Sequence, residues 1–169
     1  MTPKQSSSGP NIGVPITAAI SSTFLSGFMM SLSAITMPVL MGTNTTSSGF
    51  LNQWLRLFQY GHVSMPPTAL SVASLYAFAA FRKRADGNKH WRTYAAAAVS
   101  TIGIVPFTLL FMLPTNNIMF EWQAAETPLA LDRVYQVAAK WAWLHVIRSC
   151  FPLMGGVIGF VGILREIES

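Results

Sequence analysis

The sequence predicts an all-α protein, an antiparallel four-helix transmembrane bundle. Hydrophobic residues make up 51% of the chain and charged residues only 10%, whereas soluble domains carry about 25% charged residues. The charges are also clustered, and four stretches contain none: 5–55, 57–81, 93–120 and 149–164. A membrane helix needs about 20 mostly apolar residues, and each stretch can contain one. We therefore predict one four-span membrane domain over residues 12–169, after a disordered tail over residues 1–11.

The first half of this domain is expected to hold two spans. The first span is predicted from Ile12 to Met41, where serine and glycine recur at spacings that let helices approach closely. A polar loop over residues 42–52 should follow; it contains Asn44-Thr-Thr, a formal glycosylation sequon. Residues 51–59 are typical of an interfacial lead-in. The second span is then expected over residues 62–81, entered through the Pro66-Pro67 pair.

The second half contains the other two spans. A basic loop over residues 82–92 precedes a third span expected from Thr93 to Leu113, which should stop at Pro114. Residues 114–127 are predicted to be a loop. Thr127-Pro128 is typical of a helix start, with an N-cap residue before a proline, so the last helix is expected over residues 128–164.

The basic loop predicts the orientation of the bundle. Cytoplasmic loops of membrane proteins are enriched in lysine and arginine, so we expect this loop and both termini in the cytosol, in an endomembrane. The net charge of +5 arises largely from the same loop. Because no nucleic-acid-binding motif accompanies it, we expect membrane lipid and no nucleic acid as partners.

Several chemistries are disfavoured by the residues present. The single cysteine, Cys150, excludes an intrachain disulfide. No phosphate-binding glycine loop and no nucleotide motif occurs. His62, His145 and Glu121 could bind a metal ion, but their spacing is not that of a known ligand set, so no metal is predicted.

The most informative segment lies near the C-terminus, where an apolar helix carries a histidine and an arginine. Trp141, His145, Arg148 and Pro152 recur at i, i+4, i+7 and i+11, which places them on one helical face. Ionisable residues inside membrane segments are costly and commonly mark functional sites. We therefore predict that this face forms one wall of a pocket.

Further polar and aromatic residues are expected at the same, non-cytosolic end of the bundle. These are His62, Asn116 and Asn117, together with Trp54, Trp122 and Trp141. Each has an ordinary alternative, since tryptophans anchor membrane interfaces and Arg148 could extend to the headgroups. The convergence of two histidines, two asparagines and one arginine favours a site over these separate explanations.

Motifs along the chain resemble those of the fungal anthrone oxygenases. They are Leu25-Ser-Gly-Phe, Ser33-Ala-Ile-Thr-Met-Pro38, Gln53-Trp-Leu-Arg-Leu-Phe58, Pro106-Phe-Thr, Pro114-Thr-Asn-Asn117 and Trp141-x-x-x-His145-x-x-Arg148. The resemblance implies a small four-span membrane enzyme that oxidises anthrones to anthraquinones with molecular oxygen and no known cofactor. It also implies a planar aromatic polyketide as substrate.

Under this resemblance, chemical roles follow for the candidate residues. His145 would be the base, with His62 as the alternative, and the charge of Arg148 should keep His145 neutral. Arg148, Asn116 and Asn117 would stabilise the substrate anion and the later peroxide. The substrate-binding residues would be His62, Thr115 and three tryptophans that stack on the rings: Trp54, Trp122 and Trp141.

Two other function classes remain open at this point. One is a non-enzymatic membrane carrier or assembly partner for a hydrophobic metabolite, which would need the pocket but not the histidine and arginine. The other is a metal-dependent membrane oxidase. The sequence predicts neither the particular substrate nor the oligomeric state.

Overall fold

The structure, a computed structural model, describes residues 12–125 and 129–168 and is helical almost throughout these ranges. Its elements are α1 (Gly13–Ser31), η1 (Leu32–Thr36), α2 (Met37–Thr43), α3 (Ser47–Ala85), α4 (Trp91–Ile102), α5 (Ile104–Phe107), η2 (Thr108–Met112), α6 (Leu113–Ala124) and α7 (Leu131–Ile167). They form four helices long and apolar enough to cross a membrane: Gly13–Thr43, Ser47–Ala85, Trp91–Ala124 and Leu131–Ile167. The predicted all-α fold with four spans is confirmed.

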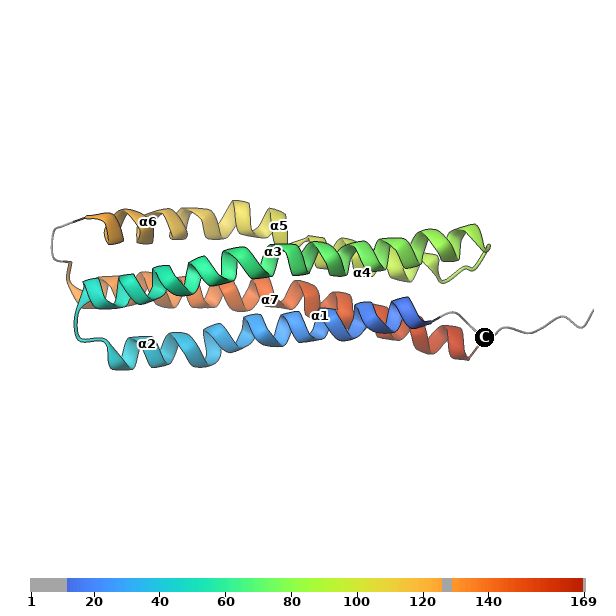
Figure 1. Ribbon diagram of the computed structural model, residues 1–169, viewed down its shortest axis with the longest axis horizontal. Coiled ribbons are helices and arrows are strands. Elements are labelled where there is room, and N and C mark those ends of the chain that lie inside the picture. The colour runs from blue at the N-terminus through green and yellow to red at the C-terminus, as the bar shows by residue number, and fades with distance from the viewer. Residues whose placement is uncertain (1–11, 126–128, 169) are drawn as a thin grey trace, which may run out of the picture.

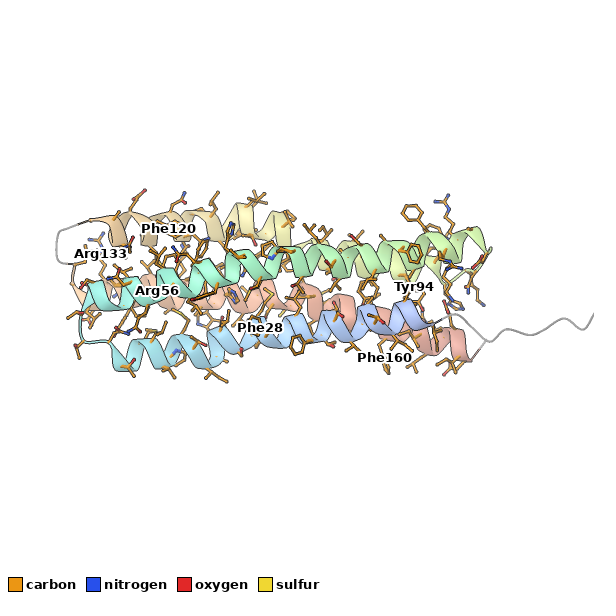
Figure 2. All side chains as sticks on the ribbon, in the orientation of Figure 1. Phe28, Arg56, Tyr94, Phe120, Arg133 and Phe160 are labelled. Carbon is orange, nitrogen blue, oxygen red and sulfur yellow. The ribbon has the colours of Figure 1, made fainter. Side chains whose placement is uncertain are left out.

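The four spans lie along one another as an elongated bundle, and consecutive spans run in opposite directions (Figure 1). α7 packs against α1 and α4, and α3 packs against the same two helices from the other side. We name the two ends of the bundle after the turns that they carry, the 44–46 end and the 86–90 end. Arg56 and Arg133 lie toward the 44–46 end, and Tyr94 and Phe160 toward the other (Figure 2).

Two predicted loops are wrong, because both segments are largely helical. Most of the loop expected at 42–52 belongs to α3, which begins at Ser47, where the Thr46 side chain accepts a hydrogen bond from the Gly49 N–H at 3.2 Å. The expected lead-in at 51–59 is part of this same helix. The loop expected at 114–127 is α6 as far as Ala124.

The boundaries of the last helix also differ from the prediction. α7 begins at Leu131 rather than at residue 128, and it continues to Ile167 instead of ending at Leu164. Thr127 and Pro128, on which the predicted start rested, lie outside the described residues. The tail predicted over residues 1–11 and the last residue, 169, lie outside them as well.

Helix α6 exists beyond Pro114 because the helix widens before the proline. A proline removes one N–H donor and its ring crowds the carbonyl four residues earlier. In both π-helical turns, η1 and η2, the residue just before a proline bonds instead to the carbonyl five residues earlier. The pairs are Met37 N–H to Leu32 before Pro38, and Leu113 N–H to Thr108 before Pro114. The helix therefore absorbs each proline and continues.

Small residues bring α1 and α4 close to α7. Serine hydroxyls of the neighbouring helices donate to carbonyls of α7 around Pro152: Ser22 to Pro152 at 2.6 Å, Ser26 to Ser149 at 2.8 Å and Ser100 to Phe151 at 3.1 Å. These contacts fix the rotation of α7 and so determine which of its faces points into the bundle.

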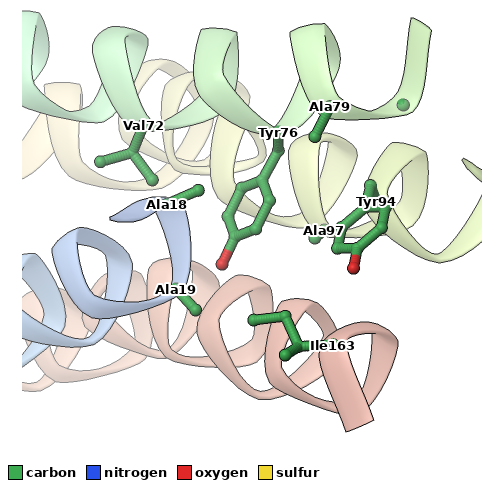
Figure 3. Packing of buried hydrophobic residues seen from close by; sticks show 9 residues of the cluster. Ala18, Ala19, Val72, Tyr76, Ala79, Tyr94, Ala97 and Ile163 are labelled. Carbon is green, nitrogen blue, oxygen red and sulfur yellow. The ribbon is translucent and has the colours of Figure 1, made fainter. Parts of the chain in front are cut away.

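The half of the bundle near the 86–90 end is filled by tyrosine and small side chains. Tyr76 extends from α3 across the interior toward α7, between the alanines of α1 and Ile163 (Figure 3). Its ring lies against Gly159, where even a methyl group would overlap it. Lys83 and Glu166 form a buried ion pair nearby. This half is a closed core.

Candidate functional site

The half of the bundle toward the 44–46 end contains a cavity of about 230 Å³ between α3, the third span and α7. Most of its wall is apolar, formed by residues such as Leu32, Met65, Ala69, Ile104 and Met112. Its polar side chains are His62, Thr108, Asn116, His145 and Arg148, and Trp141 lies beside them. A mostly apolar pocket with a few convergent polar groups is the usual form of a small-molecule site.

His145 and Arg148 both line this cavity and are bonded to each other. An Arg148 terminal nitrogen lies 2.7 Å from Nε2 of His145, whose side chain is 1% exposed. Because a guanidinium can only donate, Nε2 accepts this bond, and a neutral imidazole then carries its proton on Nδ1. The Trp141 ring stacks on the imidazole with centroids 4.8 Å apart and holds its plane.

Arg148 has no acidic partner in the described part of the chain. Its second terminal nitrogen donates to the Thr108 hydroxyl over 3.4 Å, and that hydroxyl donates in turn to the Ile104 carbonyl. The Arg148 Nε is enclosed and has no hydrogen-bond partner among the described residues. The cation is thus held beside an apolar cavity with part of its donor capacity unused, an arrangement that favours an anionic or carbonyl ligand.

Asn116 is oriented by Trp141. The indole Nε1–H donates to Asn116 Oδ1 at 2.9 Å, and both side chains are buried. Since an indole nitrogen is only a donor, this bond assigns the oxygen of the amide and leaves its NH₂ group for other acceptors. Asn116 lines the cavity, so this NH₂ group is available to a ligand there.

The two neighbours of Asn116 do not share its position. Asn117 is exposed and does not line the cavity, which differs from the expectation that both amides would meet the substrate. Thr115 is buried but is also absent from the cavity wall. Of the predicted Pro-Thr-Asn-Asn group, Asn116 is the residue that the fold brings to the site.

The remaining predicted aromatic residues have different places. Trp54 is fully buried behind Trp141, edge-on with centroids 6.1 Å apart, and so supports the wall without lining it. Trp122 lies beside a separate, more polar hollow with Gln123, and Arg133 covers its ring. Trp122 is therefore not positioned to stack on a ligand in the cavity.

His62 lies on the opposite wall from His145, on α3. It is exposed although it lines the cavity, and it stacks on Phe58 with the ring planes 10° apart. Within the described residues, no three histidine, cysteine, aspartate or glutamate side chains gather to hold a metal ion. Glu121, which had been grouped with the two histidines, does not line the cavity.

Two residues that line the cavity, Thr108 and Phe58, were not predicted as site residues from the sequence. Thr108 holds Arg148, and Phe58 forms part of the wall on which His62 stacks. Thr108 falls within the Pro106-Phe-Thr motif, which was a usable signal. Phe58 had no signal beyond its place in an aromatic stretch, because its direction depends on the rotation of α3.

The fold and this site together define a class: a four-span membrane protein with a mostly apolar internal cavity that is lined on one side by an arginine, a histidine and an amide. The family model described as anthrone oxygenase matches residues 54–158, which include all of these side chains. The chain belongs to the anthrone oxygenase family, as the resemblance predicted.

Individual relatives agree with this assignment. The chain is 43% identical over 169 residues to an anthrone oxygenase of Cryptosporiopsis sp. The matched region covers 98% of this chain and 96% of the relative. It is 42% identical over 156 residues to an anthrone oxygenase of Aspergillus novofumigatus (92% and 96%). It is 33% identical over 161 residues to the noranthrone monooxygenase of Aspergillus flavus (93% and 76%). No solved structure matches the chain.

Proposed function

We propose that this protein oxidises an anthrone-type aromatic polyketide to an anthraquinone with molecular oxygen, through a substrate carbanion and without a cofactor. The observation that carries the proposal is the Arg148 guanidinium, which adjoins an apolar cavity, bonds to His145 and has no carboxylate partner among the described residues. The names of the relatives, anthrone oxygenase and noranthrone monooxygenase, supply the substrate class.

An anthrone suits such a cavity because of where its charge develops. Loss of a proton from the central methylene gives an anion whose charge lies largely on the carbonyl oxygen opposite, as in a phenolate. A planar apolar ring system would occupy the apolar part of the cavity. Its oxygen would accept hydrogen bonds from Arg148 and from the Asn116 amide, which stabilise this charge in a site that excludes water.

His145 is the proposed base, and Arg148 controls its availability. In the structure, the Nε2 lone pair is used by the bond to Arg148. When the substrate oxygen enters, it competes for the same guanidinium donors, and Nε2 becomes free to accept the methylene proton. The stacking of Trp141 holds the imidazole in place during this exchange. Binding of the substrate thus frees His145 to act as the base.

The oxidation balances without a further reductant. The carbanion gives one electron to oxygen, and the resulting radical and superoxide combine to form a carbon–oxygen bond. The peroxide anion takes a proton and becomes a hydroperoxide. Loss of the second methylene hydrogen as a proton, with cleavage of the oxygen–oxygen bond, gives the quinone carbonyl and releases water. One oxygen atom remains in the product and the other leaves in water.

The test is turnover by the purified protein in liposomes supplied with an anthrone. We expect quinone to form faster than the spontaneous rate, to require oxygen and to persist after dialysis against a metal chelator. Labelled oxygen gas should place one labelled atom in the product. Loss of activity with the chelator would overturn the cofactor-free mechanism. Tight anthrone binding with no turnover would overturn the proposed oxygenase activity and would favour the alternative function, a carrier of hydrophobic metabolites.

A further inference from the structure

The cavity opens sideways, between α3 and the middle of the third span. Three apolar residues of its wall also belong to the outer surface of the bundle: Leu70 on α3 is 52% exposed, and Val105 and Leu109 on the third span are 42% and 59% exposed. A side chain that both lines a cavity and faces outward marks the rim of its opening.

The packing of the helices agrees with this position. α3 packs closely on α4 and again on α6, but it has little contact with α5 and η2 between them. The third span is interrupted at Gly103, between the end of α4 at Ile102 and the start of α5 at Ile104. It then widens in the π-helical turn η2. In Figure 1, α4 overlaps α3, whereas α5 and α6 continue the span along one side of α3. The two walls of the opening are therefore separated where the span is irregular.

The route toward the 44–46 end is closed by aromatic side chains. Phe58 and Phe120 meet edge to face with centroids 4.9 Å apart, and Trp54 lies against both at 5.5 and 5.3 Å. This aromatic cluster, Trp54, Phe58 and Phe120, fills the space between the cavity and the turns at that end. The cluster thus lies across the direct path from water to the cavity along the bundle axis.

The opening lies near the middle of the apolar length of both helices that border it. Leu70 follows Arg56 by 14 residues and precedes Arg82 by 12, and Val105 follows Arg92 by 13 and precedes Glu121 by 16. At about 1.5 Å per residue, each distance is close to 20 Å, which exceeds half of a hydrocarbon core of about 30 Å. The rim of the cavity therefore faces acyl chains, not headgroups or water.

We propose that the substrate is taken from the interior of the bilayer, through this lateral opening, with Leu70 and Leu109 as the residues that determine access. The proposal rests on the proposed function for the identity of the substrate: a planar aromatic compound dissolved in the membrane. Such a molecule would enter with its apolar edge against Leu70, Val105 and Leu109. Its oxygen would reach Arg148 only after the rings had passed this rim.

Two neighbouring leucines of η2 provide a matched test. Leu109 lines the cavity, whereas Leu110 is 68% exposed and does not line it. In liposomes, Leu109→Trp should lower kcat/KM for an anthrone at least tenfold, and Leu110→Trp should leave it within twofold. Leu70→Trp should act like Leu109→Trp. Equal activity of the two tryptophan variants would overturn the proposal.

A second measurement separates the lipid route from an aqueous one. An anthrone that dissolves in the bilayer is compared with an anthrone sulfonate, which stays in water. Only the first should be oxidised by the proteoliposomes. Oxidation of both at similar kcat/KM would overturn entry from the bilayer, while leaving the oxygenase activity itself in place.

A third measurement does not depend on activity. The extra fluorescence of Leu109→Trp, relative to wild type, should be quenched most by lipids brominated near the ends of their acyl chains. Stronger quenching by lipids brominated near the headgroup would contradict the position of the opening, whether or not the protein oxidises anthrones. A wild-type protein that fails to oxidise anthrones would overturn the proposed function, and the quenching result would still stand.

Discussion

Nε2 of His145 lies 2.7 Å from a terminal nitrogen of Arg148, one helical turn further along α7. Both side chains line the same apolar cavity, so the pair can exchange its mutual bond for bonds to a ligand. A histidine whose lone pair is held by a cation is a poor base until that cation finds another acceptor. The proposed catalysis depends on this exchange, and each residue of the site can be tested separately for its part in it.

His145→Ala should reduce quinone formation by about 10²–10⁴-fold, the usual effect of removing a general base. The matched control is His62→Ala on the opposite wall, which should reduce kcat less than tenfold if His62 only contacts the substrate. Initial rates in proteoliposomes, corrected for spontaneous oxidation, measure both. A larger loss from His62→Ala than from His145→Ala would reverse the assignment of the base.

Arg148→Gln should lower kcat/KM by about 10²–10³-fold, because it removes the charge opposite the developing oxyanion. Arg148→Lys keeps a positive charge, but its donors all sit on one nitrogen and cannot reproduce the planar fork by which the guanidinium reaches acceptors on separate sides. We expect it to recover only part of the loss, mainly in KM. Wild-type kcat in Arg148→Gln would show that the anion is stabilised elsewhere.

Asn116 and Asn117 form an adjacent pair with opposite surroundings. Asn116→Ala should lower kcat by about 10²-fold, since it removes a donor to the oxyanion and also leaves the Trp141 indole without its acceptor. Asn117→Ala should remain within twofold of wild type, because Asn117 is exposed away from the cavity. Steady-state kinetics of the two variants, at equal protein content, decide between them. Similar losses in both would contradict the orientation of α6.

This pair also shows what the sequence could and could not specify. The spacing of Trp141, His145 and Arg148 is enough to place them on one face, because α7 is regular over that stretch. The choice between Asn116 and Asn117 is different. They follow a π-helical turn, and one extra residue in a turn rotates everything after it by about 100°. A sequence pattern counted at normal helical spacing therefore loses its phase there.

The wrong loop boundaries have a related cause. A loop over residues 114–127 is predicted because the third span is expected to stop at Pro114, and the polar residues that follow, such as Thr115, Asn116 and Glu121, fit a loop. In the structure, the amide oxygen of Asn116 accepts a hydrogen bond from Trp141, which lies on α7 and is distant in the sequence. The spans themselves were predictable because long stretches without charge allow few other folds. The partners of single polar groups depend on tertiary packing, which composition does not contain.

The close contact between α7 and its neighbours predicts opposite effects for two glycines. A methyl group at Gly155 would overlap the Thr101 side chain and lie 3.1 Å from the Ala97 carbonyl, whereas the position beyond Gly27 is open. Gly155→Ala should therefore lower the free energy of unfolding by about 1–3 kcal/mol, as overpacking does. Gly27→Ala should raise it by about 0.5–1 kcal/mol, because alanine favours a helix. Thermal unfolding in detergent measures both, and destabilisation by Gly27→Ala would contradict the exposed position.

The buried pair of Lys83 and Glu166 joins α3 to α7 at the 86–90 end, far from the cavity. Their side chains are only 9% and 1% exposed, so removing the lysine leaves the buried Glu166 carboxylate without its cation. Lys83→Met should cost about 3–5 kcal/mol in the free energy of unfolding, which is typical for breaking a buried ion pair. The control is Lys89→Met, an exposed lysine of the nearby turn, which should change stability by less than about 0.5 kcal/mol. The pair lies away from the reacting groups. At a temperature at which the Lys83→Met variant remains folded, its KM for an anthrone should therefore equal that of the wild type. A changed KM at unchanged stability would mean instead that the pair acts on the cavity through α7.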